Sequence, residues 1–558
     1  MDIKSRMGRA HMKPRIQEWL FIVVLGDQHP AESISPPGAE AQFLGPDEPH
    51  APQWLANFGN RFYQLALASL WVYLGAASKS VIDTDVIVVG GGPSGVTAAY
   101  ELHRVGIRAI VLEAKDRLGG RSHSIKRSTG EGTVELGATW INNKTQPEVV
   151  ALTELLGLDL AVQYDAGSTV HEDSQGVVHE VKREPCPFGD EAVFPCPFNS
   201  NNEEDKFMAL ALFNKIETEA YQVDLRDHDA FGPERDVTVA EWLEMDETLA
   251  GNVHVRDTMS NLVAQLVGRE SREVGAHYFL DYIKSGGSLS ELGGEDENGA
   301  QYLKVKQGTM AIWEGLADKI GPKSVRLDTP VEAIRRCNGH SIVASSTGEL
   351  FRAKKIIMAV PTNMYQSITF KPQLPAAKQE LFPQTMPGVY AKVVINYKEA
   401  WWRDANLGGR FTSLDEGPAC FTFEASDMSL QHYSLAVFVA GDKARRWLRL
   451  GTEDEKKQAV VDHIASMATA VDPKLAQKAQ DVLEVNMAEW ALEPYLFGGP
   501  TNSMGPGLLR KYGKALREPA GDVHFAGGET AYEWKGYLEG AVLAGQRAAK
   551  EVIEALAD

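Results

Sequence analysis

The stretch from residue 85 to residue 113 follows an order of elements that few folds accommodate. Asp85–Val89 is a short apolar run rich in β-branched residues, which predicts a buried strand of a parallel sheet. The glycine-rich turn Gly90–Gly95 follows at once, and helical periodicity then runs over Val96–Val105. A second apolar strand, Ile107–Leu112, completes a β-α-β unit. This order predicts an α/β fold with a Rossmann-like dinucleotide-binding domain.

The turn has the spacing Gly-x-Gly-x-x-Gly, which suits a bound pyrophosphate. Gly90 allows the tight turn, Gly92 lets a phosphate approach the backbone, and Gly95 lets the helix pack on the strand. The helix N-terminus offers free N–H groups and a positive dipole end to the phosphates. Glu113 lies 23 residues after Gly90, where it can accept a hydrogen bond from the adenosine ribose. The predicted cofactor-binding residues of this unit are Gly90, Gly92, Pro93, Ser94, Gly95 and Glu113.

The residues after the second strand discriminate between FAD and NAD. Glu113–Arg121 (EAKDRLGGR) resembles the Glu-Ala-x-x-Arg-x-Gly-Gly-Arg signature of the FAD-dependent amine oxidase superfamily. The glycine pair Gly119-Gly120 permits close backbone approach, and Arg121 can neutralise pyrophosphate charge. The resemblance implies FAD as the cofactor and adds Ala114, Gly120 and Arg121 to the predicted FAD-binding residues.

Four later segments extend the resemblance in the order that the family has, from about residue 84 to residue 556. They are similar to the segment beside the flavin ring, the strand that holds the adenine, the strand and turn that close the FAD site, and the start of the final helix; here they are Glu135–Trp140, Thr329–Ile334, Val523–Thr530 and Trp534–Gly540. The chain thus resembles the flavin monoamine oxidases, with the fungal type nearest in character. This implies further FAD contacts at Gly137, Ala138, Thr139, Trp140, Val331, Trp490, Gly528, Glu529 and Leu538.

A lysine stands among apolar residues in the predicted strand that begins at Met386. By pattern alone, an exposed position is the favoured interpretation for Lys392, because lysine is almost never fully buried. The segment resembles the family strand whose lysine holds a water against flavin N5, and that resemblance reverses the interpretation. We therefore assign Lys392 as a catalytic residue.

Tyr537 is the second predicted catalytic residue. By resemblance it forms one wall of an aromatic cage that aligns the amine, although core packing also explains an aromatic residue near a helix start. In the family the second wall follows a glycine pair, here Gly498-Gly499. This chain has no aromatic residue just after that pair, so Phe497 or Tyr495 is the predicted substitute.

The same region predicts how the flavin is held. In animal monoamine oxidases a cysteine after the glycine pair bonds covalently to the flavin, but Trp490–Thr501 contains no cysteine. Cys420, the nearest upstream, is far outside the segment, so we predict noncovalent FAD. The spacing of the four cysteines fits no metal pattern, so no metal site is predicted. Cys186 and Cys196 are expected to be unpaired thiols in a loop.

The charge of the chain excludes one class of partner. Its 558 residues hold 56 Lys and Arg against 76 Asp and Glu, a formal net charge of −20. Nucleic-acid binders carry a basic patch or stripe, so no nucleic-acid partner is expected. Residues 1–80 hold seven basic and seven acidic residues, so the whole net charge lies in residues 81–558.

Residues 1–82 differ from the rest and are predicted to form an N-terminal extension. A basic start and a short apolar run, Trp19–Gly26, resemble a signal peptide, and a Pro-rich linker follows over residues 30–53. The apolar residues 62–77 are too short for an ordinary membrane span, so a docked or peripheral helix is favoured over membrane contact. A cytoplasmic location is favoured, with a secretory or membrane-associated one as the second choice, and a homodimer is left open.

We expect two interleaved domains after the extension. The predicted FAD-binding domain comprises residues 83–165, 304–380 and 488–558, and the predicted substrate domain, a mixed-sheet α+β unit, comprises residues 166–303 and 381–487. The expected reaction turns a primary amine, O₂ and water into an aldehyde, ammonia and hydrogen peroxide.

Three alternatives stay open. The first is a polyamine or L-amino-acid oxidase of the same superfamily, although no arginine can be assigned to a substrate carboxylate. The second is an enzyme like the carotenoid desaturases or protoporphyrinogen oxidases, which share the N-terminal motif but should lack the Lys392 strand and Trp534–Gly540. The third is a flavin-binding scaffold protein without turnover.

Overall fold

The computed structural model describes residues 81–182 and 203–557. The signal-like start, the linker, the apolar stretch at 62–77 and both Cys186 and Cys196 lie outside the described residues. Within the described part of the chain, no helix combines the length and the apolar character needed to cross a membrane. Cys337 and Cys420 are free thiols.

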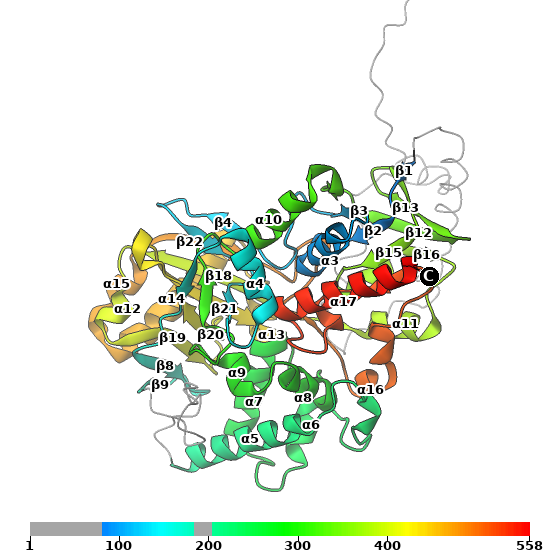
Figure 1. Cartoon of the computed structure of the whole chain (residues 1–558). Helices are drawn as coiled ribbons and strands as arrows, with labels where there is room; N and C mark the ends of the chain where they lie inside the picture. Colours follow the sequence, from blue (N-terminus) through cyan, green and yellow to red (C-terminus); the bar gives the residue numbers. More distant parts are fainter. Residues whose placement is uncertain (1–80, 183–202, 558) are drawn as a thin grey trace, which may run out of the picture. The chain divides into compact units, whose positions relative to one another are not determined.

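A five-stranded parallel sheet contains the predicted β-α-β unit. Its strands run in the order β11 (Val325–Arg326), β3 (Ala109–Leu112), β2 (Val86–Val89), β15 (Lys355–Met358) and β24 (Val523–Phe525). Every residue of β2 and β3 is buried, as continuous apolar runs in a doubly covered parallel sheet should be. Helices α3 (Pro93–Arg104), α10 (Met310–Ile320) and α17 (Leu538–Ala557) lie together beside this sheet (Figure 1).

The boundaries of the unit differ slightly from those predicted. The helix begins at Pro93 rather than Val96, because proline fits the first turn, where its missing N–H would have no partner. The second strand begins at Ala109 rather than Ile107, after Gly106 turns the chain with φ of +79°. Both differences leave the glycine turn at the carboxyl end of β2.

A second five-stranded sheet is mixed, with its two outer pairings parallel and its two inner pairings antiparallel. Its order is β1 (Ile82–Asp83), β14 (Leu350–Ala353), β13 (His340–Ser345), β12 (Val331–Cys337) and β16 (Thr369–Lys371). Three small sheets complete the strands: β4 (Ser124–Lys126) with β5 (Thr133–Glu135); β6 (Trp140–Ile141), β10 (Leu303–Val305) and β7 (Leu160–Val162); and β17 (Met386–Pro387) with β23 (Asn502–Ser503).

A seven-stranded mixed sheet carries Lys392. Its order is β22 (Val482–Ala488), β18 (Tyr390–Tyr397), β21 (Tyr433–Ala440), β20 (Phe421–Glu424), β19 (Leu407–Ser413), β8 (Ser168–Glu172) and β9 (Val178–Val181). Helices α12 (Trp401–Asp404), α13 (Gly441–Trp447) and α14 (Glu453–Val471) pack on one face through a single apolar cluster.

Strand β18 is buried on both faces, and its alternation decides where each side chain points. Ala391, Val393 and Ile395 belong to the cluster under the helices, whereas Tyr390 and Val394 belong to the cluster on the opposite face. Successive strand residues alternate between faces, so Lys392 shares the face of Tyr390 and Val394.

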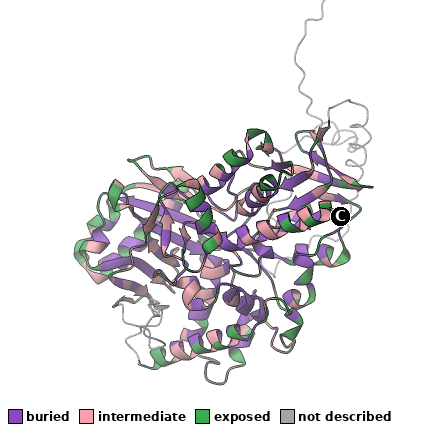
Figure 2. Ribbon diagram, in the orientation of Figure 1, coloured by how far each residue is buried: buried purple, intermediate pink, exposed green. Residues whose placement is uncertain are grey.

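Residues 203–293, a part of the predicted substrate domain whose sequence shows no recognisable motif, are largely helical. Their helices are α5 (Glu203–Tyr221), α6 (Val239–Glu244), α7 (Val253–Val267), α8 (Ala276–Ser285) and α9 (Leu289–Gly293), and they gather at the lower end of the view in Figure 1. The remaining helices are α4 (Pro147–Leu156), α11 (Ala376–Leu381), α15 (Ala476–Gln480) and α16 (Leu508–Tyr512). Figure 2 shows the buried residues concentrated in the strands and the exposed ones on outer helix surfaces.

The two largest groups of strands come from different parts of the chain. The parallel sheet takes its strands from residues 86–112, 325–358 and 523–525, and the seven-stranded sheet takes them from residues 168–181 and 390–488. By contacts, residues 79–558 form one compact unit. The exact domain limits stay predictions.

Candidate active site

The glycine turn has the geometry that its residue types predict. Gly90 has φ of +103°, a conformation that favours glycine, and a Cβ atom at Gly95 would lie 2.0 Å from the Gly90 carbonyl oxygen. Helix α3 has no side-chain cap at Gly92, so no side chain takes up its first N–H groups. Ser94 Oγ accepts a hydrogen bond from the Gly527 N–H (2.8 Å), which joins this turn to the one after β24.

Gly92 provides a direct test of whether a phosphate fits here. A Cβ atom at Gly92 would have only the Gly120 Cα within 4 Å, at 3.9 Å. The space above this residue is therefore not filled by the packing of the protein itself. An uncapped helix N-terminus beneath open space is suited to a pyrophosphate, so the residues present fit FAD.

Glu113 lies at the carboxyl end of β3, beside the turn. Its Oε2 accepts from the Gly91 N–H (2.6 Å) and its Oε1 from the Lys115 N–H (2.8 Å). Burial raises the pKa of this carboxyl group. Each carboxylate oxygen has a further lone pair, so Glu113 can still accept from ribose hydroxyls.

The backbone beside Glu113 brings two more predicted FAD contacts to the same edge. Ala114 follows at a half-buried position. The Thr329 N–H donates to the Glu113 carbonyl oxygen (2.8 Å), and this places the start of β12 at Val331 nearby.

Arg121 lies between the segments that frame the predicted flavin site. Its Nη1 donates to the Pro500 carbonyl oxygen and to Glu529 Oε1, both at 2.7 Å. Glu529 is 3% exposed, and its Oε2 has no hydrogen-bond partner. The sequence predicted charge neutralisation at the pyrophosphate for Arg121. In the structure this arginine also joins the 120–121 turn to the loop at Pro500 and to the turn that contains Gly528.

Lys392 is 2% exposed and lies against the predicted flavin segment. Its Nζ donates to the Gly137 carbonyl oxygen (2.9 Å) and to Thr139 Oγ1 (2.5 Å). The same Nζ is 5.1 Å from the Trp140 ring centroid and 5.2 Å from that of Phe438. Burial lowers the pKa of Lys392, and the Glu135 carboxylate opposes that change. Two acceptors and two aromatic faces thus compensate for the burial of this ammonium group.

Side chains from several elements fix the 135–140 segment around Lys392. The Ala138 N–H donates to the Arg121 carbonyl oxygen (3.1 Å), and Thr309 Oγ1 donates to that of Ala138 (2.9 Å). Trp490 Nε1 donates to the Leu136 carbonyl oxygen (2.9 Å). The structure therefore brings Lys392, Trp490 and the 137–140 segment together, and their roles in the site stay predictions.

Tyr537 lies just before Leu538, the buried first residue of α17. Its ring centroid is 5.3 Å from that of Trp534 and 6.3 Å from that of Tyr282. Its hydroxyl donates to the Leu292 carbonyl oxygen (3.2 Å). Tyr282 comes from α8, in the region without a motif, so no sequence signal pointed to it.

Neither of the two residues predicted to form the second wall of the aromatic cage is buried. Tyr495 is 42% exposed and Phe497 is 46% exposed, and both have positive φ, of +65° and +51°. Tyr390 is instead buried on the Lys392 face of β18, with its ring 5.9 Å from that of Phe438. The two-residue period of β18 could have identified Tyr390 once Lys392 was assigned.

A buried ion pair, which was not predicted from the sequence, holds the loop that contains Tyr537. Lys535 Nζ donates to Asp281 Oδ2, and the two side chains are 1% and 0% exposed. The loop is also bound to the end of α8, because the Trp534 N–H donates to the Ser285 carbonyl oxygen (2.7 Å) and the Lys535 N–H to Ser285 Oγ (3.2 Å). Asp281 and Lys535 are 254 residues apart, so no local pattern links them.

Clusters of His, Cys, Asp and Glu suited to a metal ion do not occur within residues 81–182 and 203–557. The site as described therefore consists of an uncapped helix terminus, a buried lysine and an aromatic group. These features can hold a dinucleotide and orient an organic substrate beside it.

The two glycines of the turn should respond differently to one added methyl group. Gly92→Ala keeps an extended backbone (φ −75°, ψ 178°) and meets open space, so the melting temperature of the apoprotein should change by less than about 2 °C. FAD binding should weaken at least about tenfold, since the methyl group enters the space predicted for a phosphate. Gly95→Ala should instead destabilise the fold by about 1–3 kcal/mol through overpacking. Thermal melts and FAD fluorescence titration measure both, and wild-type FAD affinity in Gly92→Ala would contradict the assignment.

Removing one partner of the Asp281–Lys535 pair leaves an uncompensated buried charge. Lys535→Met should therefore cost about 3–5 kcal/mol and lower the melting temperature, whereas Asp281→Leu combined with Lys535→Met should recover most of the loss. The matched control is Lys398→Met, which removes the exposed ion pair with Asp481 (2.7 Å) and should cost less than about 1 kcal/mol. Equal melting temperatures for Lys535→Met and Lys398→Met would show that the buried pair contributes nothing.

Comparisons with known proteins agree with this site. The family model of flavin-containing amine oxidoreductases matches residues 93–553. Flavin-containing amine oxidase B of Mus musculus is 31% identical over 479 residues, which cover 85% of this chain and 86% of that protein. The probable flavin-containing monoamine oxidase A of Dictyostelium discoideum is 30% identical over 480 residues, which cover 85% of this chain and 98% of that protein.

Solved structures show the same fold. Cyclohexylamine oxidase from Brevibacterium oxydans IH-35A has a TM-score of 0.75 and 27% sequence identity, and wild-type putrescine oxidase bound to putrescine has a TM-score of 0.75 and 26% identity. Each comparison covers 85% of this chain and 100% of the other. The predicted α/β fold with a Rossmann-like FAD domain, the FAD cofactor and the oxidation of amines are thereby confirmed. This chain belongs to the family of flavin-containing amine oxidoreductases.

Proposed function

We propose that the protein oxidises a primary amine with O₂ and water to an aldehyde, ammonia and hydrogen peroxide, using noncovalently bound FAD. The observation that supports this most is Lys392. This lysine is almost fully buried, and its ammonium group is hydrogen-bonded to Gly137 and Thr139. Those two residues belong to the segment that is predicted to run beside the flavin ring. Structural packing alone does not require a charged group there, because burying it costs free energy.

The side chains have separate roles in this proposal. FAD would be held by the glycine turn, Glu113 and the Arg121–Glu529 pair, and it supplies the acceptor for a hydride from the carbon next to the amine nitrogen. Lys392 would place its ammonium group beside the reacting centre, where it can hold a water and stabilise negative charge on oxygen. Tyr537, with Trp534 and Tyr282, would form an apolar wall against which the uncharged amine is aligned.

A diamine or polyamine substrate is the second candidate. One of the similar solved structures is putrescine oxidase bound to putrescine. The chain also carries a net charge of −20, and cationic substrates are attracted by a negative field.

A peroxide assay with benzylamine, hexylamine, spermidine and a long-chain amino alcohol separates the candidates. The proposed function predicts stoichiometric peroxide and aldehyde from the three monoamines. Their kcat/KM should be at least about tenfold above that for spermidine. The opposite order would indicate a polyamine oxidase. A purified FAD-loaded protein that forms no peroxide with any amine would indicate a scaffold and contradict the proposal.

Acid precipitation tests the noncovalent attachment. Trp490–Thr501 has no cysteine, and Cys420 is buried against Ala440, where its Sγ accepts from the Ala440 N–H (3.3 Å). The yellow chromophore should therefore stay in the supernatant when the protein is precipitated. Colour that remains in the washed pellet would mean a covalent bond to another residue.

A further inference from the structure

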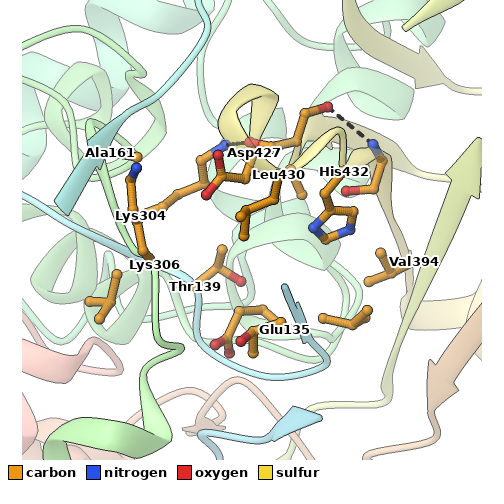
Figure 3. Close-up of a pocket in the computed structure, with 15 residues that line it drawn as sticks. Glu135, Thr139, Ala161, Lys304, Lys306, Val394, Asp427, Leu430 and His432 are labelled. Atoms are coloured by element: carbon orange, nitrogen blue, oxygen red, sulfur yellow. Dashed lines mark hydrogen bonds between the residues drawn. The ribbon is translucent and has the colours of Figure 1, made fainter. Parts of the chain in front are cut away.

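A polar pocket lies beside the Lys392 site. The aromatic residues Trp534, Tyr537 and Tyr282 do not line it. Its walls come from β5, β10, β18 and the loop around Met428–Leu430 (Figure 3). The volume that the centres of water molecules can occupy in it is about 40 Å³, which is enough to hold water. Its titratable lining residues are Glu135, Lys304, Lys306, Asp427 and His432.

A single hydroxyl group connects this pocket to Lys392. Thr139 lines the pocket, and its Oγ1 accepts the hydrogen bond from Lys392 Nζ (2.5 Å). The Lys392 ammonium group itself is buried. The Thr139 hydroxyl donates to the Gly137 carbonyl oxygen (3.2 Å). When that hydroxyl turns to a water in the pocket, a proton on Nζ can pass to Thr139 Oγ1 while the hydroxyl proton leaves to the water.

Glu135 provides a second exchanging group at the same place. Glu135 and Thr139 both line the pocket, and in Figure 3 they lie below Asp427 and His432. Glu135 Oε1 accepts from Ser124 Oγ (2.6 Å) and the Thr309 N–H (2.8 Å). Burial raises the pKa of Glu135, and the charge of Lys392 opposes that change. The other charged or titratable groups that line the pocket with Glu135 are Lys304, Lys306, Asp427 and His432.

The proposed reaction requires protons to cross the protein boundary, and the inference rests on that function. An ammonium substrate loses one proton to become the neutral amine, whose C–H bond then breaks with its electron pair transferred to FAD as hydride. When O₂ later takes up that hydride equivalent, hydrogen peroxide forms only if one further proton arrives. One proton therefore leaves and one returns in each turnover.

We propose that this pocket is the proton route of the active site, in which Thr139 and Glu135 exchange protons between Lys392 and water. Lys306 lines the pocket and is exposed, so the proposed route can reach bulk solvent beside it. In this arrangement the substrate side can exclude water while protons travel along a separate path.

Two variants and one matched control test the route. Glu135→Gln keeps an acceptor for Ser124 and Thr309 but cannot exchange a proton. Ala161→Phe fills the pocket from β7 without removing any polar group. Val162→Phe is its control, because Val162 is the next residue of the same strand, points to the other face and is 62% exposed.

The measurement uses the FAD-loaded full chain after photoreduction, mixed with O₂ in weakly buffered solution containing a pH indicator. No amine is present, so a wrong substrate assignment would not affect the result. Wild type and Val162→Phe should take up about one proton per flavin in step with the return of the yellow colour. In Glu135→Gln and Ala161→Phe, uptake should slow at least about tenfold, since a positioned proton-transfer group contributes 10²–10⁴-fold. Wild-type timing in either variant would overturn the proposal. Lack of peroxide with every amine would refute the proposed function alone.

Discussion

Burying the Lys392 ammonium group removes it from water, and the arrangement of the active site follows from how that cost is offset. The Gly137 carbonyl and the Thr139 hydroxyl accept its hydrogen bonds, and the Trp140 and Phe438 rings face it at 5.1 and 5.2 Å. The Gly137–Trp140 segment must therefore hold its position against β18. Arg121 and Thr309 fix that segment through hydrogen bonds to the backbone of Ala138, and Trp490 bonds to the adjacent Leu136 carbonyl oxygen. The lysine thus couples the seven-stranded sheet to the loop beside the glycine turn.

The fold around the glycine turn could be predicted because its determinants are local. A continuous apolar strand, a turn that needs glycine and a proline in the first turn of a helix all lie within about thirty residues. The burial of Lys392 could not be predicted that way. β18 is buried because β22 and β21 flank it and apolar clusters cover both faces, and the sequence of the strand contains none of these contacts. Only the resemblance to a family indicated that Lys392 is buried in the site and not exposed to solvent.

The rest of the site depends on distant contacts. Asp281 and Lys535 pair from positions 254 residues apart, and Tyr282 meets Tyr537 from a helix without a motif. The second aromatic wall could not be assigned from the resemblance to the family. Phe497 and Tyr495 were chosen by position, yet both are largely exposed, whereas Tyr390 is buried on the face of Lys392. The alternation of β18 places Tyr390 on that face, and position relative to the glycine pair does not reveal this.

In the proposed function, Lys392 acts on the reaction of O₂ and is not only a packed side chain. The direct measurement is the second-order rate constant with which the photoreduced enzyme is reoxidised by O₂, for Lys392→Met and Lys378→Met. Lys378 is an equally buried lysine, 1% exposed and with its pKa lowered by burial to about 7, but it lies over the Phe525 ring. Removing a positioned charge that stabilises developing negative charge should lower the constant about 10²–10³-fold in Lys392→Met and leave Lys378→Met near wild type. Equal constants in both variants would contradict the account.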